Sequence, residues 1–105
     1  MVKEITGNQF KELFEPDEIN PMMLDIYAEW CGPCKVLAPL LEKLSNQYET
    51  IDFYKLNSDN NSDFAAELNI QGVPTLLFVN KNKEIFRSVG ALPESELKKV
   101  LEQIQ

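Results

Sequence analysis

The chain has 105 residues, of which 44% are hydrophobic and 26% are charged, and its formal net charge is −7. This length and composition predict one globular domain, residues 1–105, with a core that needs no structural metal. The negative charge disfavours nucleic acids and anionic membranes as partners, and no apolar run approaches the roughly 18 residues of a membrane-spanning helix.

Strands and helices alternate in the first part of the predicted order. Residues 2–5 suit a short edge strand, and Asn8 is placed to cap a short helix with its apolar side chains on one face. Pro16 and Pro21 bracket a polar loop. Residues 22–28 have few polar interruptions, which is typical of a central strand that is covered on both faces.

The middle of the chain predicts a long helix, a second central strand and a short helix. In residues 31–48, apolar side chains recur at helical spacing, and Pro39 within this segment is expected to kink the helix. Residues 51–56 suit the strand. A polar stretch then leads to a short helix, for which Asn61 or Ser62 is the predicted cap.

The end of the chain predicts a hairpin and a last helix. Residues 75–79 and 85–89 suit two strands joined by residues 80–83, where the turn needs positive φ angles that Asn tolerates best after Gly. Pro93 is expected to open a helix with an apolar stripe. The order β-α-β-α-β-α-β-β-α predicts an α/β fold with a central mixed sheet of about five strands, flanked by four helices.

The segment Trp30-Cys31-Gly32-Pro33-Cys34-Lys35 carries the candidate chemistry. It lies between a predicted central strand and a helix, where ligand sites of open α/β sheets are found. With Cys31 at the helix start, Cys34 lies one turn further on the same face, so a disulfide can form without rearrangement. The unpaired N–H groups and partial positive charge of the helix terminus favour a thiolate on Cys31.

A lone Cys-x-x-Cys pair is also compatible with half of a zinc site or with two incidental core thiols. The chain has two cysteines and no histidine, so it supplies only half of a four-thiolate zinc site and forms neither a Ser–His–Asp triad nor a Cys–His pair. The start of the chain lacks a secretory leader, which predicts the cytoplasm. In that reducing compartment, catalysis, redox sensing or metal binding suits the pair better than a permanent bridge.

The segment 30–35 resembles the active-site signature of the thioredoxin family. The resemblance extends over nearly the whole chain, because further motifs follow at matching spacings: Asp25, Ala28-Glu29, Pro39, Lys55, Gly72-Val73-Pro74-Thr75 and Val89-Gly90-Ala91. It implies the thioredoxin fold and general reduction of protein disulfides. Cys31 would attack the partner disulfide, and Cys34 would resolve the mixed disulfide.

The resemblance also implies partners. A separate flavin-containing thioredoxin reductase, supplied by NADPH, would restore the dithiol, and disulfide-containing proteins would be the substrates. The chain has no glycine-rich nucleotide motif, so we expect it to bind neither NADPH nor flavin, and we expect no metal. A monomer is expected.

Asp25 stands between Leu24 and Ile26 in an otherwise apolar strand. A buried carboxylate is costly, which predicts either a raised pKa or a charged partner. The resemblance implies that Asp25 relays a proton for Cys34 and that Lys55 tunes Asp25. The alternative is a solvated charge at the end of a strand.

Family resemblance further implies a substrate groove around the cysteines. The Val73–Pro74 bond would be cis and would face them, leaving the Val73 backbone free for strand addition, whereas periodicity alone favours a trans turn. Trp30 would form a substrate platform rather than part of the core, and the glycines would keep the groove open rather than serve ordinary turns. The predicted substrate-contacting residues are Trp30, Gly32, Pro33, Gly72, Val73, Pro74 and Gly90.

Two other functions remain open. An oxidase or isomerase of an oxidising compartment would use the same chemistry, but the Gly32-Pro33 insert holds no histidine and so predicts only a modest fall in the pKa of the Cys31 thiol. A non-catalytic module would grip a partner by the groove. The sequence also departs from the family at Tyr27, where many relatives have Trp or Phe, so we expect a different environment for Asp25.

Overall fold

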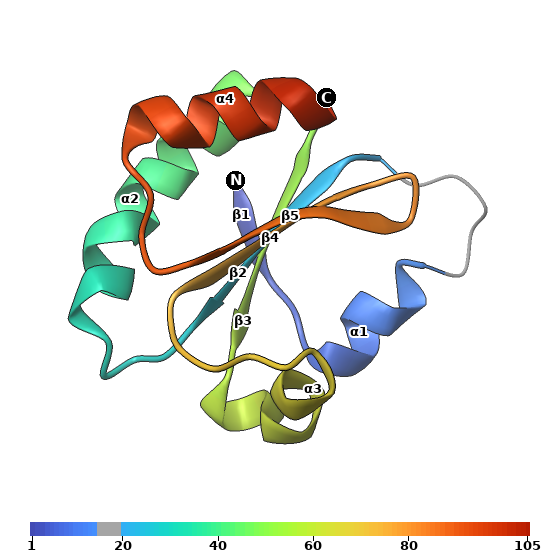
Figure 1. Cartoon of the computed structure of the whole chain (residues 1–105), viewed down its shortest axis with the longest axis vertical. Coiled ribbons are helices and arrows are strands. Elements are labelled where there is room, and N and C mark those ends of the chain that lie inside the picture. Colours follow the sequence, from blue (N-terminus) through green and yellow to red (C-terminus); the bar gives the residue numbers. More distant parts are fainter. Residues whose placement is uncertain (15–19) are drawn as a thin grey trace.

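A five-stranded mixed β-sheet, in the order β1-β3-β2-β4-β5, forms the centre of the molecule (Figure 1). The computed structural model describes residues 1–14 and 20–105, so most of the loop predicted between Pro16 and Pro21 lies outside the described residues. Helices α2 and α4 cover one face of the sheet, and α1 and α3 cover the other. The predicted fold class is confirmed.

The elements follow the predicted order closely. The strands are β1 (Val2–Glu4), β2 (Met22–Tyr27), β3 (Asp52–Asn57), β4 (Thr75–Asn80) and β5 (Lys83–Val89). The helices are α1 (Gly7–Glu12), α2 (Gly32–Gln47), α3 (Ser62–Glu67) and α4 (Glu94–Ile104), with a 3-10 turn at Asp59–Asn61. Within the described segments, no helix combines the length and apolar character needed to cross a membrane.

Strand β2 occupies the middle of the sheet and joins its parallel and antiparallel parts. It pairs in parallel with β3 and in antiparallel with β4, and the Ile26–Thr75 pair lies at one end of this contact. The carboxyl end of β2 therefore meets the amino end of β4. The stretch before Thr75 thus comes to the same end of the sheet as the cysteine motif that follows β2.

Two apolar cores enclose the sheet because consecutive β2 side chains alternate between its faces. Met23 packs with leucines of α2 and α4, whereas Leu24 packs with Phe10 of α1 and Phe64 of α3. Both faces are covered, which explains why β2 is almost continuously apolar. A fully buried leucine contributes about 2 kcal/mol in these cores.

Helix α1 is capped by a different residue from the predicted one. Thr6, not Asn8, is the capping residue: its hydroxyl accepts the Gln9 N–H at 3.2 Å, and the Gln9 side chain accepts the Thr6 N–H at 2.9 Å. This reciprocal capping box satisfies two otherwise unpaired donors. The prediction of Asn8 is therefore wrong. At α3, Asn61 does occupy the cap position, but its side chain makes no capping bond.

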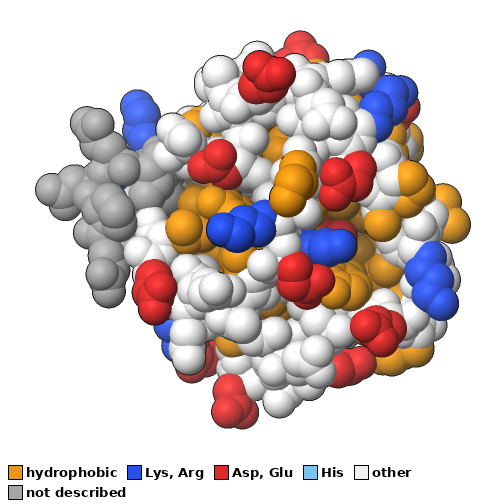
Figure 2. All heavy atoms as spheres, turned by 180° about the vertical axis from the view of Figure 1, so that it is seen from behind, with side chains coloured by type: hydrophobic (Ala, Val, Ile, Leu, Met, Phe, Trp, Pro, Cys, Tyr) orange, Lys and Arg blue, Asp and Glu red, His pale blue; other side chains and the backbone are white. Residues whose placement is uncertain are grey.

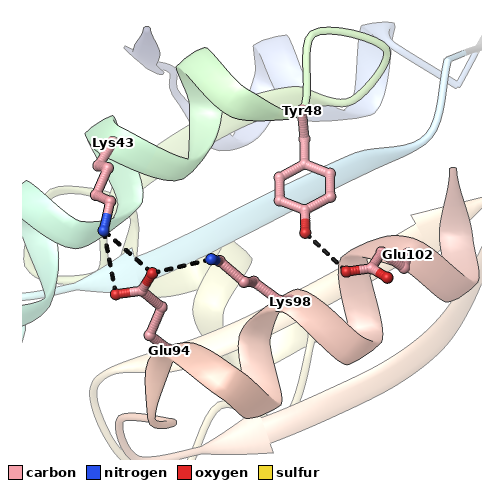
Figure 3. Close-up of polar contacts among 5 residues, drawn as sticks. All are labelled: Lys43, Tyr48, Glu94, Lys98 and Glu102. Carbon is pink, nitrogen blue, oxygen red and sulfur yellow. Dashed lines mark hydrogen bonds and ion pairs between the residues drawn. The ribbon is translucent and has the colours of Figure 1, made fainter.

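Helices α2 and α4 lie side by side and exchange polar contacts along their exposed edges (Figure 3). Lys43 of α2 forms an ion pair with Glu94 of α4 at 3.1 Å, and Lys98 shares the same carboxylate. Further along the two helices, the Tyr48 hydroxyl donates to Glu102 at 2.9 Å. The contacts with the two lysines lower the pKa of Glu94. They orient two helices that their buried leucines already hold together.

The β4–β5 connection is a two-residue turn. Lys81 and Asn82 have φ angles of 52° and 62°, so the predicted positive φ values are confirmed, and the strands extend further into residues 80–83 than expected. Positive φ at both positions matches the right-handed twist of the strands. Lysine takes one of these positions although it is not favoured there.

The surface carries charges of both signs. On the face shown in Figure 2, acidic and basic side chains are interspersed among apolar ones. Among the described residues, the exposed apolar side chains include Trp30, Val36 and Val89.

Candidate active site

Cys31 and Cys34 form a disulfide at the amino end of α2, with their Cα atoms 5.3 Å apart. Cys31 is the N-cap residue, and its sulfur accepts the Cys34 backbone N–H at 3.2 Å. A donor of the first helical turn thus points at the Cys31 sulfur, where it stabilises a thiolate. The predicted placement of both cysteines at a strand-to-helix junction is confirmed.

The local sequence explains this placement. Pro33 occupies the first turn of α2, where a missing N–H removes no helical hydrogen bond. Gly32 is exposed, and a Cβ at this position would meet nothing within 4 Å. The helix continues through Pro39. Both cysteines are buried, with 4% and 5% of their surfaces exposed.

Trp30 lies outside the core, with 72% of its surface exposed. Its indole N–H donates to Asp59 at 2.9 Å, which ties the residue before the disulfide to the turn that follows β3. Asn57 shapes this turn by accepting the Asp59 backbone N–H at 2.9 Å. A large, mostly exposed ring is therefore held in place next to Cys31 in the chain.

Asp25 is buried in the middle of β2, with 4% of its surface exposed. Burial raises its pKa from 3.8 to about 7, Lys55 opposes this effect, and Glu4 adds to it. The alternative of a solvated charge at a strand end is excluded. Asp25 also lines a pocket of about 410 Å³ together with Cys34.

Three charged side chains form a row across the sheet on the α2 face. Lys55 of β3 lies opposite Asp25 of β2 in the strand register, and Glu4 of β1 lies opposite Lys55 on the other side. Tyr27, two residues after Asp25, donates its hydroxyl to the Glu4 carboxylate, 2.8 Å from either oxygen. Burial and this hydrogen bond raise the pKa of Tyr27.

The Val73–Pro74 peptide bond is cis, as the family resemblance implied and as periodicity alone did not. Val73 packs against the cluster that contains both cysteines. Neither backbone group of Val73 forms a hydrogen bond within the part of the chain that the structure describes. The unpaired backbone of Val73 thus lies beside the cluster that contains the disulfide.

Gly72 and Gly90 flank this segment. Gly90 has a φ of 97°, a conformation that residues with a Cβ rarely adopt, and its N–H donates to the Pro74 carbonyl at 2.7 Å. The Gly72 carbonyl accepts the Thr75 hydroxyl at 2.6 Å. A Cβ at Gly72 would lie 3.7 Å from the exposed Val89 side chain, an ordinary contact. The structure thus brings the cysteine motif, residues 72–74 and Gly90 to one end of the sheet, whereas Asp25 and Lys55 lie within strands β2 and β3.

Two residues of this region were not predicted from the sequence: Glu4 and Asp59. The register of β1 against β3 brings Glu4 to Lys55, and the Asn57 turn brings Asp59 to Trp30. The polar sequence from Asn57 onward predicts a turn, but it does not predict that the turn contacts Trp30. Among the described residues, no group of three or more acidic, cysteine or histidine side chains could hold a metal ion.

Comparison with known proteins gives a consistent result. The family model described as "Thioredoxin" matches residues 1–103. "Thioredoxin-1" of Saccharomyces cerevisiae is 42% identical over 88 residues, which cover 84% of each chain. "Thioredoxin" of Mycoplasma pneumoniae is 36% identical over 98% of this chain and 100% of its own. The X-ray structure of Fasciola hepatica thioredoxin superposes with a TM-score of 0.90 at 28% identity, covering 99% of this chain and 100% of that one.

Proposed function

Because the chain belongs to the thioredoxin family and is a dithiol–disulfide oxidoreductase, we propose that Cys31 is its attacking thiolate and Cys34 its resolving thiol. The observation that carries this assignment is the Cys34 backbone N–H that points at the Cys31 sulfur at the start of α2. A thiolate is more stable on Cys31 for this reason, whereas Cys34 lies further inside the helix.

The cycle transfers two electrons to the partner protein. The Cys31 thiolate attacks one sulfur of the partner disulfide, forms a mixed disulfide and releases the other partner sulfur as a thiolate. The Cys34 thiol loses its proton and attacks the Cys31 sulfur. The partner leaves fully reduced, and the Cys31–Cys34 disulfide seen in the structure is the product.

Asp25 is the proposed proton acceptor for Cys34. Both residues line the same pocket, and a carboxyl with a pKa of about 7 exchanges protons readily near neutral pH. Lys55, opposite Asp25 in the register, favours the ionised carboxylate and thereby tunes the relay. Slower disulfide exchange by Asp25→Asn across pH 6 to 9 is the expected result, and unchanged rates would exclude the relay.

The substrate is proposed to lie along the unpaired backbone of Val73, where an extended peptide adds as a strand. Trp30 supplies an apolar platform on the other side of the disulfide. The absence of side chains at the glycines leaves room for the incoming backbone. The proposed substrate-contacting residues are Trp30, Gly32, Pro33, Gly72, Val73, Pro74 and Gly90.

Serine variants test the assignment of the two cysteines. Reduced Cys34→Ser, mixed with a disulfide-containing protein such as insulin, should accumulate a mixed disulfide that a non-reducing gel resolves. Cys31→Ser should trap none, and the double variant should reduce nothing. Trapping by Cys31→Ser instead would reverse the assignment. A double variant that keeps its role in the cell would mark a binding module.

The reduction potential of the Cys31–Cys34 couple tests the direction of electron flow. We expect a value well below that of the glutathione couple at pH 7, measured in a glutathione buffer with Trp30 emission as the probe. A value well above it would identify an oxidant or isomerase of an oxidising compartment.

The proposed electron donor is NADPH through a separate thioredoxin reductase, which makes the chain a carrier in electron transport and cell redox homeostasis. Oxidation of NADPH by a purified flavin-containing reductase should require both this protein and insulin. The proposed working form is a cytoplasmic monomer that acts as one domain. Sedimentation at one molecular mass, a single unfolding transition and a reduced Cys31–Cys34 pair in the cytoplasmic fraction are the expected results.

A further inference from the structure

We propose that Glu4 and Tyr27 form a positioning pair, which decides how much of the positive charge of Lys55 is available to Asp25. The proposal deepens the proton-relay role proposed above for Asp25 and rests on it. It gives a function to the tyrosine that departs from the family pattern and to an acidic residue on the edge strand β1.

The geometry of three adjacent strands places Lys55 between two carboxylates. Glu4 on β1 and Asp25 on β2 both lie directly opposite Lys55 on the intervening strand β3. Side chains of register partners point to the same face, and neighbouring strands are only about 4.8 Å apart. The positive charge of Lys55 therefore lies between two carboxylates, and a closer approach of Glu4 to Lys55 would leave less of that charge to stabilise the ionised form of Asp25.

The Tyr27 hydroxyl controls the position of the Glu4 carboxylate. Tyr27 lies two residues after Asp25 on the same face of β2, and its hydroxyl reaches over β3 to lie 2.8 Å from both oxygens of Glu4. Within residues 1–14 and 20–105, Lys55 forms no ion pair with any carboxylate. Tyr27 thus holds Glu4 back from Lys55.

Other charged groups near Asp25 play a smaller part. Among the described residues, the charges that shift the pKa of Asp25, besides its burial, are those of Lys55 and Glu4. The Glu42 carboxylate of α2 is engaged by the Val2 backbone N–H at 3.1 Å. Asp25 lines two pockets, and the titratable side chains that line them, besides those already named, are Cys34, Lys35 and Glu29.

Substitutions of Glu4 and Tyr27 should shift the pKa of Asp25 in opposite directions. Removal of the Glu4 charge leaves Lys55 wholly to Asp25 and lowers the pKa of Asp25. Removal of the Tyr27 hydroxyl frees Glu4 to approach Lys55, which raises the pKa of Asp25. The effect of Tyr27 requires the charge on Glu4, so it should vanish in a protein that lacks that charge.

The test is a pH titration of the oxidised protein with ¹³C-labelled aspartate, in which the Asp25 carboxyl carbon reports its own protonation. Glu4→Gln should lower the pKa of Asp25 by about 0.5 to 1, and Tyr27→Phe should raise it by about 0.5. The double variant should match Glu4→Gln alone. Glu12→Gln is the matched control, because it removes an equal charge from α1 on the opposite side of the sheet.

Three results would overturn the proposal: no change in Glu4→Gln, an equal change in Glu12→Gln, or a rise in the double variant as large as that in Tyr27→Phe alone. The last result would mean that Tyr27 acts through burial rather than through Glu4. If Tyr27→Phe does not fold, the contrast between Glu4→Gln and Glu12→Gln decides the outcome.

The pH dependence of insulin reduction separates this proposal from the relay itself. If the positioning pair and the relay are both correct, the pH–rate profile of Glu4→Gln shifts together with its measured Asp25 pKa. Asp25→Asn then lacks the part of the profile that follows this pKa. If the pKa shifts but Asp25→Asn keeps the wild-type profile, the relay fails and the positioning pair stands. If Asp25→Asn changes the profile but neither variant moves the pKa, the positioning pair fails and the relay stands.

Discussion

The carboxyl group of Asp25 and the side chain of Lys55 lie opposite each other on parallel strands, yet Asp25 Oδ1 is buried without a hydrogen-bond partner among the described residues. Lys55 therefore only partly offsets the effect of burial. The folded state favours the protonated carboxyl, which has a pKa of about 7. The consequence is a stability that depends on pH.

Stability should fall as the pH rises from about 4 to 7. Below pH 4, Asp25 is protonated in both states; between its unfolded value of 3.8 and its folded value of about 7, the unfolded chain alone releases the proton. Unfolding is therefore increasingly favoured, by up to about 4 kcal/mol above pH 7. Asp25→Asn removes this component, so its free energy of unfolding should exceed that of the wild type by about 2 to 4 kcal/mol at pH 8.

Urea unfolding of the oxidised protein at several pH values measures this difference. The exposed Asp63→Asn is the control and should follow the wild type. A difference between Asp25→Asn and the wild type that stays constant from pH 4 to 8 would contradict the assignment.

Gly7→Ala should destabilise the protein by about 1 to 3 kcal/mol, although alanine is the better helix former. A Cβ at Gly7 would lie 2.6 Å from the Cβ of Phe64, which is buried between α1 and α3. The two helices would have to separate. Gly32→Ala is the control, because it also changes the first residue of a helix but meets nothing within 4 Å. Equal urea midpoints for the two variants would refute this close approach.

Arg87→Met should lower the free energy of unfolding by roughly 1 kcal/mol. The guanidinium Nη1 donates to the Leu68 carbonyl at 2.7 Å, at the carboxyl end of α3, and Nη2 donates to Glu84 at 2.8 Å. Arg87 thus ties β5 to α3, while its partner Glu84 lies on the surface. Glu84→Gln should change the unfolding free energy by less than about 0.5 kcal/mol. A loss in Glu84→Gln as large as that in Arg87→Met would show that the ion pair, and not the carbonyl contact, stabilises the fold.

Lys81→Gly should raise the free energy of unfolding by about 0.5 kcal/mol. Lys81 is exposed and has a φ of 52°, which glycine adopts without steric penalty. Lys83→Gly, at the start of β5, should instead lower stability because glycine weakens a strand. Thermal unfolding followed by circular dichroism distinguishes the two variants, and a loss of stability in Lys81→Gly would contradict the turn geometry.

Local patterns in the sequence predicted the order of the elements and the position of the disulfide. Apolar continuity marked β2 as a central strand, and the spacing of the cysteines at a strand-to-helix junction placed both at the start of α2. The start of α1 was also encoded locally, because Thr6 and Gln9 match a capping box. Asn8 was the wrong choice although the correct signal lay two residues earlier.

Contacts between distant strands were not predictable in the same way. Glu4 lies opposite Lys55 and contacts Tyr27 only because β1 pairs with β3, and periodicity says nothing about which strands become neighbours. The contact of Arg87 with Leu68 likewise depends on where β5 lies relative to the carboxyl end of α3. The cis bond before Pro74 came from family resemblance, since trans bonds predominate before proline.

Strand β4 runs antiparallel to β2, so its first and last residues lie at opposite ends of the sheet. Its first residue, Thr75, follows the segment that faces the cysteines, and its last, Asn80, leads into the Lys81–Asn82 turn at the far end of the sheet. A six-residue strand spans roughly 20 Å. We therefore expect a peptide inserted between Lys81 and Asn82 to lie about one strand length from Thr75, and disulfide exchange to continue unchanged.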